Sequence, residues 1–392
     1  MRDHSPAFSI WLATRVGVSL LALLAGLYIP GRAPAGTAPY VNPPMPAFWD
    51  RLFGVWSRWD GLWYLQIATA GYNPNDGTTA FFPLYPMLIG GLGRILGERY
   101  LWAGVIVSSL CMLAALILLY RLVREQYAGA WSGGLFLLGE RTLLFLAIFP
   151  FAFFFWAIYS ESLFLLLAIL MFYAAWRKQW LLAGLALAGA FWTRPFGIVL
   201  LPCLLWEIWI VVRSGEKGDR RAWFAAWPAI VVPGVAGLGL LLWSALALGN
   251  PLVFLSTQSE WNRAFSWPWE TIINAFRIAA ATPFEYQEEN QSWTYLAALL
   301  LFIGLAIAGW WRKNLRGPHA LYLTLGLLFP LFSATPRNPL LSMPRFELVL
   351  FPAFIVLALV ARRDWLFYLV VVTSLMLQAL YLIRFANWFW VA

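Results

Sequence analysis

Charged side chains are scarce in this sequence. Only 11% of its 392 residues are Asp, Glu, Lys or Arg, whereas 62% are hydrophobic. A soluble globular domain has about 25% charged residues. A surface this poor in charge would not stay dissolved, so we expect most of it to face lipid. The 25 tryptophans agree, because indole rings favour the headgroup level of a bilayer.

Cysteine and histidine are scarce as well. Cys111 and Cys203 lie in different apolar runs, and we interpret them as small buried hydrophobes, not as a disulfide or metal site. With His4 and His319 as the two histidines, we expect no histidine-based metal centre and no cofactor. The net charge of +9 is spread in short clusters between apolar runs. We therefore expect membrane lipids as partners, and no nucleic acid.

Long apolar runs predict an all-α, polytopic fold of about eleven transmembrane helices. No polar linker and no convincing internal repeat divides the chain, so we expect a single domain, 1–392. The expected spans are 8–28, 101–120, 131–155, 161–176, 180–193, 195–212, 223–248, 293–311, 319–335, 346–361 and 365–385.

Lysine and arginine indicate which loops face the cytoplasm. They concentrate in short connections such as 177–178 and 362–363. The positive-inside rule places these connections in the cytoplasm and the two long loops, 29–100 and 249–292, outside. The apolar run 84–96 is short, and a crossing there would invert the later charge pattern. We therefore predict an interfacial helix at 84–96.

The first external loop carries two short helical patterns. Apolar side chains recur at helical spacing from Phe48 to Trp59, and a second helix is expected over 61–68. Two amphipathic helices on the membrane surface would hold Arg58 and Asp60 at their junction. From this pattern alone, Asp60 is either the N-cap of the following helix or a catalytic carboxylate.

Several segments together resemble one known family. In chain order they are Ser57–Ala68, Gly71-Tyr72, Ala80–Pro86, Tyr159–Phe164, Thr193–Gly197, Gly249–Pro251 with Gln258, Trp261 and Arg263, and Ser342–Phe346 with Phe351-Pro352. The series resembles the family of GPI mannosyltransferase II, the PIG-V-like proteins, whose bacterial members are also similar in length. Phe346 departs mildly from the tyrosine of the family pattern. The order and spacing of the matches make the signal specific.

The resemblance implies a GT-C fold and a polyprenyl-phosphate sugar donor that carries mannose, of the dolichol phosphate mannose kind. It also implies transfer on the lumenal or periplasmic side, with an acidic residue of the first external loop as the base. That role falls on Asp60. In a bacterium the location would be the inner (plasma) membrane, with the active site facing outside. The acceptor would be a lipid, a glycan or a protein, because nothing in the chain indicates the GPI precursor of the eukaryotic members.

The chemistry of such a transfer gives the other candidates their roles. A base takes the proton of the acceptor hydroxyl, and arginines stabilise the departing phosphate. Asp60 is our candidate base, and Glu161 is either a second active-site acid or a helix cap. The candidate phosphate ligands are Arg345, Arg194, Arg58 and Arg263. Arg58 could instead pair with Asp60 or Asp50 or extend to lipid headgroups, and Arg345 could contact a lipid headgroup. The candidate substrate ligands are Trp59, Tyr64, Tyr159, Gln258 and Trp261.

The predicted function is an inverting glycosyltransferase that moves a hexose, expected to be mannose, to an acceptor hydroxyl in one displacement. No metal is expected, although a weak divalent-cation site at Asp60 and Glu161 is left open. The alternative is a transporter or flippase of lipid-linked sugars, but the inverted repeats typical of transporters are not apparent. A non-catalytic subunit of a membrane complex is a third possibility, and it predicts that Asp60 is dispensable.

Overall fold

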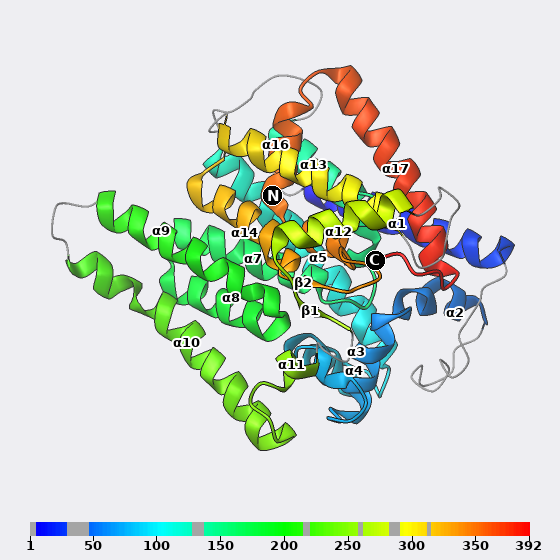
Figure 1. Ribbon diagram of the computed structural model, residues 1–392, viewed down its shortest axis with the longest axis horizontal. Coiled ribbons are helices and arrows are strands. Elements are labelled where there is room, and N and C mark those ends of the chain that lie inside the picture. The colour runs from blue at the N-terminus through cyan, green and yellow to red at the C-terminus, as the bar shows by residue number, and fades with distance from the viewer. Residues whose placement is uncertain are drawn as a thin grey trace.

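The computed structural model describes residues 5–29, 47–127, 137–214, 220–257, 262–281, 291–311 and 315–392 (Figure 1). Most of these residues are helical, and the described strands form a single two-stranded pair. Among the described residues, six helices are long and apolar enough to cross a membrane. The prediction of a helical, polytopic membrane protein is thereby confirmed, and the chain is an integral membrane protein.

The six candidate spans come from both halves of the chain. They are α1 (Ser5–Tyr28), α5 (Tyr100–Gln126), α9 (Leu200–Ser214) with the preceding 3-10 turn η6 (Pro195–Val199), α10 (Arg220–Leu248), α13 (Ser292–Trp311) and α17 (Asp364–Ala386). Shorter apolar helices accompany them, namely α7 (Glu161–Trp176), α8 (Trp180–Thr193), α14 (Gly317–Leu331) and α16 (Phe351–Val360). The total of about eleven membrane crossings stays a prediction.

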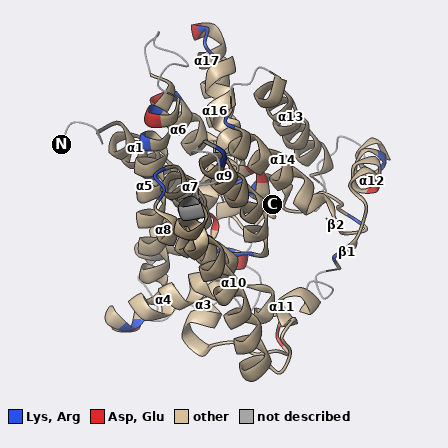
Figure 2. Ribbon diagram, turned by 90° about the vertical axis from the view of Figure 1, so that its left-hand side faces the viewer, with Lys and Arg blue, Asp and Glu red and all other residues tan. Residues whose placement is uncertain are grey.

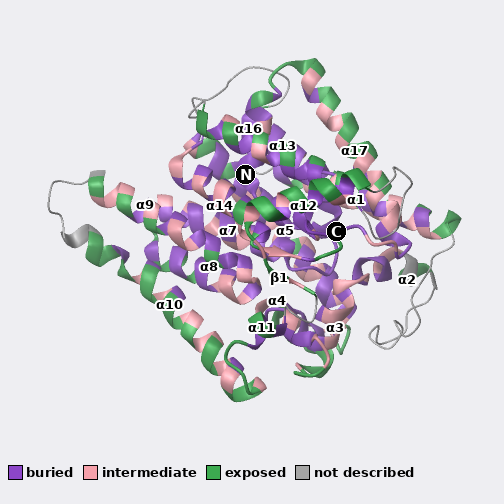
Figure 3. Cartoon of the chain, viewed as in Figure 1, coloured by how far each residue is buried: buried purple, intermediate pink, exposed green. Residues whose placement is uncertain are grey.

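Three of the long helices lie at the periphery of the protein (Figure 3). Only 17% of the apolar window of each of α1, α10 and α17 is buried inside the protein. Along α10 the exposed side chains include Leu238 at 68%, Leu242 at 61% and Leu246 at 80%. These leucines recur every four residues and so share one face of the helix. A contiguous apolar face of this kind marks contact with lipid.

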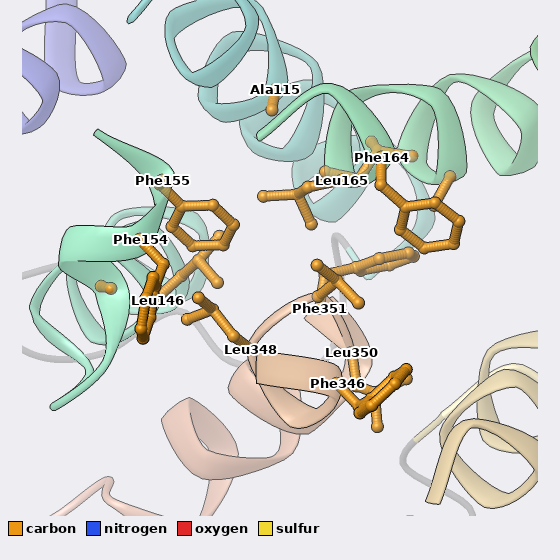
Figure 4. Packing of buried hydrophobic residues seen from close by; sticks show 14 of the residues in the cluster. Ala115, Leu146, Phe154, Phe155, Phe164, Leu165, Phe346, Leu348, Leu350 and Phe351 are labelled. Atoms are coloured by element: carbon orange, nitrogen blue, oxygen red, sulfur yellow. The ribbon is translucent and has the colours of Figure 1, made fainter. Parts of the chain in front are cut away.

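Helix α7 lies at the centre of the bundle, where it packs against both α5 and α8. Its aromatic side chains contact the later part of the chain. The Phe164 ring lies 5.4 Å from that of Phe196, and the Phe172 ring lies 5.6 Å from that of Phe351. Figure 4 shows Phe164 and Phe351 within this packed cluster. Because lipid is as apolar as these side chains, close packing stabilises the contact more than exclusion of water does.

Two glycines allow segments to approach closely. A Cβ at Gly184 of α8 would lie 2.6 Å from the carbonyl oxygen of Pro228 in α10. A Cβ at Gly197 would lie 2.7 Å from the carbonyl oxygen of Ala190. Neither position has room for a side chain, as is typical where membrane helices pack through small residues. The second approach bears on function because Gly197 belongs to the turn that follows Arg194.

The predicted span 131–155 is wrong as a continuous helix. Its described part forms α6 (Leu138–Ile148), an irregular segment, and the 3-10 turn η5 (Ala152–Phe155), while residues 131–136 lie outside the described part. Pro150 explains the break, because a proline disfavours the α conformation of the residue before it. Phe149 accordingly has φ −52° and ψ 143°. Hydropathy does not reveal the break, because residues 149–160 are all buried.

Two later spans are also shorter than predicted. The run 346–361 is divided between α15 (Met343–Leu348) and α16, with Pro352 in the first turn of α16. The run 319–335 is helical only to Leu331, and the chain then forms strand β2 (Ser333–Ala334). Non-helical backbone inside a membrane protein is tolerated where it is buried or lines a cavity. Both breaks lie near the charged site described below.

The first long loop contains the helices that the sequence predicts. Its elements are α2 (Ala47–Phe53), the 3-10 turn η3 (Gly54–Ser57), α3 (Asp60–Ala70), the 3-10 turn η4 (Thr78–Ala80) and α4 (Leu84–Ile95). Helices α2 and α3 match the two predicted patterns, and α4 matches the run 84–96. Their location at a membrane interface stays a prediction.

The second long loop is tied to the segment that follows α14. Its described elements are α11 (Val253–Ser256), β1 (Ala264–Phe265) and α12 (Pro268–Ala281). Strand β1 pairs antiparallel with β2, with Ala264 opposite Ala334 and Phe265 opposite Ser333. Helix α12 was not foreseen from the sequence. The strand pair holds the second loop against the chain that leads to α15.

Ion pairs mark the two ends of α7. At the C-terminal end, Arg177 pairs with Glu125 at 2.8 Å. At the N-terminal end, Glu161 pairs with Arg194 and Arg345. Helix α7 has 16 residues, so its ends are about 24 Å apart. Figure 2 shows that charged residues are sparse along the rest of the ribbon.

We expect the two ends of α7 to face opposite sides of the membrane. Phe265 belongs to the loop 249–292, predicted to be external, and Arg363 to the connection 362–363, predicted to be cytoplasmic. Both are exposed, Phe265 by 69%, and so suit cysteine labelling better than the C-terminal Ala392, which is only 3% exposed. In a variant without Cys111 and Cys203, an impermeant maleimide should label Phe265→Cys from outside intact cells. Arg363→Cys should react only after permeabilisation. Labelling of both from the same side would contradict this topology.

Candidate active site

Four charged side chains from distant parts of the chain meet at the N-terminal end of α7. Arg345 donates from Nη1 to Asp60 Oδ2 at 2.6 Å and from Nε to Glu161 Oε1 at 2.8 Å. Arg194 Nη1 lies 3.1 Å from the same oxygen of Glu161. We call Asp60, Glu161, Arg194 and Arg345 the ion cluster.

The ion cluster is largely shielded from solvent. The exposed fraction of the side chain is 0% for Glu161, 7% for Arg345, 11% for Arg194 and 15% for Asp60. Two carboxylates balance two guanidinium groups, so the cluster is neutral in sum. Removal of one partner from a buried pair leaves an uncompensated charge and costs about 3–5 kcal/mol. Arg345 is the central member, because it bonds both acids.

Local chain geometry positions each member of the cluster. Asp60 and Glu161 are the first residues of α3 and α7, where the positive end of the helix dipole favours a carboxylate. Arg194 has the extended conformation that Pro195 imposes on the residue before it, with φ −158° and ψ 148°. Arg345 lies in the short helix α15. The break between α15 and α16 thus keeps Arg345 at the level of the two helix N-termini.

The Tyr159 hydroxyl holds the turn that carries Asp60. It donates to the carbonyl oxygen of Arg58 and accepts the backbone N–H of Asp60, both at 3.2 Å. Between these two residues, Trp59 has φ 54° and ψ −117°, a sparsely populated conformation for a residue with a side chain. Such strain costs about 1–3 kcal/mol and persists at functional sites when the surroundings enforce it.

Asp60 makes no capping hydrogen bond at the start of α3. The N-cap of α3 is Trp59, and no side chain caps this helix. The carboxylate of Asp60 is directed to Arg345 instead. Glu161 likewise is not a cap, because Ser160 is the N-cap of α7. Both acids are therefore placed for interaction with the arginines.

A cavity of about 150 Å³ opens beside the ion cluster. Five of the residues proposed from the sequence line it. The lining residues are Asp60, Tyr64, Ala80, Phe81, Phe82, Thr193, Arg194, Pro195, Arg263, Leu341, Ser342, Arg345, Phe346 and Trp390.

Arg263 gives this cavity a positive charge. It lies directly before β1, and the described residues hold no ion pair with it. Burial lowers the pKa of Arg263 to about 10, and the like charges of Arg345 and Arg194 act in the same direction. Arg263 is still a cation at neutral pH. With the ion cluster neutral in sum, the cavity suits an anionic ligand such as a phosphodiester.

Tyr64 adds a hydroxyl oxygen to the wall of the cavity, and its proton is engaged with a neighbouring serine. Its hydroxyl donates to Ser160 Oγ at 2.9 Å. Burial raises the pKa of Tyr64 well above its ordinary value, and the charge of Glu161 raises it further. The phenol therefore stays protonated throughout the physiological pH range.

Other predicted residues lie near the cavity without lining it. Glu161 is fully buried behind Arg345, and Tyr159 supports the turn. The guanidinium of Arg58 lies 4.5 Å from the centre of the Trp388 ring, and Trp59 lines a second cavity. Gln258 and Trp261, predicted to bind substrate, lie outside the described residues.

Trp390 and Ser342 line the cavity but were not predicted from the sequence. Trp390 belongs to an aromatic run after the last helix, a pattern equally typical of an interfacial belt. Ser342 immediately precedes α15 and has φ 65°. Arg345, three residues later, is the feature of the sequence that points to this segment as part of the site. No local pattern places Trp390 beside Asp60, because that contact joins the two ends of the chain.

A buried ionic cavity at one end of a helical bundle defines a polytopic membrane protein with an internal polar site, as found in membrane enzymes and transporters. The family model described as Mannosyltransferase (PIG-V) matches residues 15–209, about half of the chain, and the chain belongs to this family of glycosyltransferases. The resemblance seen in the sequence is confirmed. No curated protein matches the chain.

Membership of this family implies mannosyltransferase activity, with a mannose donor and an acceptor. The matched stretch contains Asp60, Glu161 and Arg194. Arg263 and Arg345 lie beyond it and join the site through the fold.

The support that Tyr159 gives to Asp60 predicts a kinetic effect. Tyr159→Phe removes two hydrogen bonds, each worth about 0.5–1.5 kcal/mol, from a strained turn. We expect kcat to fall roughly tenfold or more, with the KM for the donor nearly unchanged. Tyr173→Phe is the matched control, because the Tyr173 hydroxyl bonds Glu125 at the other end of α7, at 3.1 Å. Equal effects of the two variants on kcat would show that the Tyr159 hydroxyl has no special role.

Proposed function

We propose that this chain transfers mannose from a polyprenyl-phosphate donor to an acceptor hydroxyl in one inverting displacement. The enzyme would have a GT-C fold and act on the external side of the plasma membrane. The observation that carries the proposal is the cavity in which the Asp60 carboxylate lies beside three arginines, Arg194, Arg263 and Arg345.

Asp60 is suited to act as the general base. Its Oδ2 accepts the hydrogen bond from Arg345, whereas no hydrogen bond from the described residues reaches Oδ1. The free oxygen can accept the proton of an acceptor hydroxyl as the new glycosidic bond forms. Arg345 is then a positioning residue for Asp60 and also one wall of the anion site.

The arginines are suited to hold the phosphate. Phosphate is an adequate leaving group, so the reaction requires charge stabilisation and no general acid. Arg263 faces the cavity without an ion pair among the described residues, and Arg194 contributes a second guanidinium group. Arginine binds phosphate oxygens in a bidentate manner that fixes orientation as well as charge.

The inventory of acids supports a single displacement. Among the described lining residues, Asp60 is the one carboxylate, while Glu161 is fully buried and bonded to Arg345. A retaining glycosyl transfer by the two-carboxylate route needs a second carboxylate that reaches the anomeric carbon.

The aromatic side chains Phe81, Phe82 and Phe346 on the cavity wall suit the first isoprene units of a lipid donor.

Replacement of the base tests the proposal most simply. Asp60→Asn keeps the size of the side chain and a hydrogen-bond acceptor for Arg345. Arg345 also keeps its ion pair with Glu161, so we expect the variant to fold with reduced stability. Turnover of a polyprenyl-phosphate mannose donor should fall by about 100-fold or more, the usual worth of a positioned base. The control is Glu98→Gln, which removes an exposed carboxylate between α4 and α5.

Near-normal turnover of folded Asp60→Asn would rule out Asp60 as the base. A flippase, the alternative function, would translocate the donor lipid and form no mannosylated product. The same assay separates these outcomes, because product formation and lipid translocation are measured independently.

Arg263, which has no ion pair among the described residues, is expected to contribute to donor binding. Arg263→Ala should raise the KM for the donor by about tenfold or more, because a charge-assisted hydrogen bond contributes about 1.5–3 kcal/mol. Folding should be little affected, because no ion pair with a described residue is broken. The control is Arg94→Ala, which removes an exposed arginine from the last turn of α4. An unchanged KM for Arg263→Ala would place the phosphate elsewhere.

A further inference from the structure

A second and larger cavity adjoins the first. Its volume is about 710 Å³, within the range of roughly 300–1,000 Å³ that is usual for ligand pockets. Leu341 and Trp390 line both cavities, and Trp59 of the second cavity is the chain neighbour of Asp60 in the first. The full lining is Trp59, Asn262, Thr335, Pro336, Arg337, Asn338, Leu341, Trp388, Phe389 and Trp390.

Three indole rings form one wall of the second cavity. The Trp59 ring lies 5.8 Å from the Trp388 ring and 5.2 Å from the Trp390 ring, both edge to face. Trp59 and Trp388 both have positive φ angles, 54° and 64°. Two strained tryptophans side by side indicate a wall that the surrounding structure enforces.

The C-terminal segment that carries two of these rings is firmly anchored. The carbonyl oxygen of Trp390 accepts hydrogen bonds from Gln291 Nε2 at 2.6 Å and Arg384 Nη2 at 3.0 Å. The Tyr295 hydroxyl donates to the Val391 carbonyl at 3.2 Å. These bonds and the burial of Val391 distinguish the segment from an aromatic belt that rests on headgroups.

Polar groups also line the second cavity. Asn338 is 7% exposed, its amide lies within hydrogen-bonding reach of the Tyr295 hydroxyl, and no other described residue bonds its side-chain polar atoms. The Thr335 hydroxyl donates to the backbone carbonyl of Asn338 at 2.7 Å and fixes this turn. A buried amide with one such neighbour has hydrogen-bonding capacity left over, whereas nearly all buried polar groups are paired. An amide can donate to one hydroxyl and accept from another.

We propose that the second cavity is the acceptor site, and that it binds a pyranose ring of a glycan or glycolipid. This inference rests on the proposed function. The apolar face of a sugar ring packs against the indoles, while its hydroxyls pair with Asn338 and Asn262. Indole side chains are suited to this because they combine a large apolar face with a rigid shape. Among the described residues no acidic side chain lines this cavity, so Asp60 in the adjoining cavity is the base that a bound hydroxyl meets.

The reaction then balances across the two cavities. The acceptor oxygen, held beyond Trp59, forms a bond to the anomeric carbon while its proton passes to Asp60. The bond between that carbon and the phosphate oxygen breaks, and the electron pair leaves with the polyprenyl phosphate beside Arg263. The mannosylated glycan departs through the larger cavity.

Two substitutions test the acceptor site. Asn338→Ala and Trp388→Leu should each raise the KM for a glycoside acceptor about tenfold or more. The donor KM and the slow hydrolysis of donor without acceptor should stay within about twofold. Trp388→Phe keeps an aromatic face, so its acceptor KM should lie between those of the wild type and Trp388→Leu. This variant tests the proposal even if Trp388→Leu fails to fold. Trp267→Leu, an exposed tryptophan stacked on Trp269 away from this cavity, is the control.

The acceptor panel consists of octyl and methyl glycosides of mannose, glucose, galactose and N-acetylglucosamine, with octanol and a serine-containing peptide as comparisons. Equilibrium binding of each is measured by titration calorimetry alongside turnover. Preference for octyl over methyl glycosides indicates a glycolipid, and equal use of both indicates a free glycan. If no glycoside binds, if octanol or the peptide is preferred, or if Asn338→Ala leaves the glycoside KM unchanged, the proposal is overturned. Loss of turnover in Asp60→Asn alongside such a result would leave the proposed function intact.

Discussion

The buried guanidinium group of Arg345 is the constraint on which the site depends. It bonds Asp60 and Glu161 at once, and it joins the first long loop, the start of α7 and the short helix α15. In a protein with few charges, a buried pair broken on one side costs about 3–5 kcal/mol, a large share of ordinary stability. The same interaction that holds these segments together therefore also fixes the orientation of the carboxylate that the chemistry needs.

The fold supports this interaction with breaks in its helices. Pro150 ends a segment that hydropathy alone would continue, Pro195 redirects the chain after α8, and the gap between α15 and α16 brings Arg345 to the N-terminal end of α7. Tyr159 then fixes the strained turn that carries Asp60. The turn at Trp59, the break at Pro195 and the gap before α16 place Asp60, Arg194 and Arg345 at the cavity. This is the usual reason for non-helical backbone in a membrane domain.

Much of the architecture follows from the sequence, because the physics of lipid-facing helices is local. The apolar runs predict most of the helices. The sequence motifs single out the Arg58–Asp60 junction, Arg194 and Arg345, which the structure brings to the cavity or beside it. The prediction of an unbroken span over 131–155 was wrong, because it follows the hydropathy of the run and neglects the helix-breaking effect of Pro150. Trp390 was missed, and the partner of Asp60 was not foreseen, because both contacts join residues at nearly opposite ends of the chain. Hydrophobic periodicity and helix-capping motifs extend over only a few neighbouring residues, so they do not reveal such a long-range contact.

The measurement that tests the account most directly is the structure of the folded Asp60→Asn variant with an intact polyprenyl-phosphate mannose bound. The account predicts the phosphate within hydrogen-bond distance of Arg263 and Arg194. It also predicts the side chain at position 60 on the opposite face of the anomeric carbon, with the cavity walled by Trp59 and Trp390 open beyond it. A phosphate bound away from these arginines, or an anomeric carbon that position 60 does not approach, would contradict it.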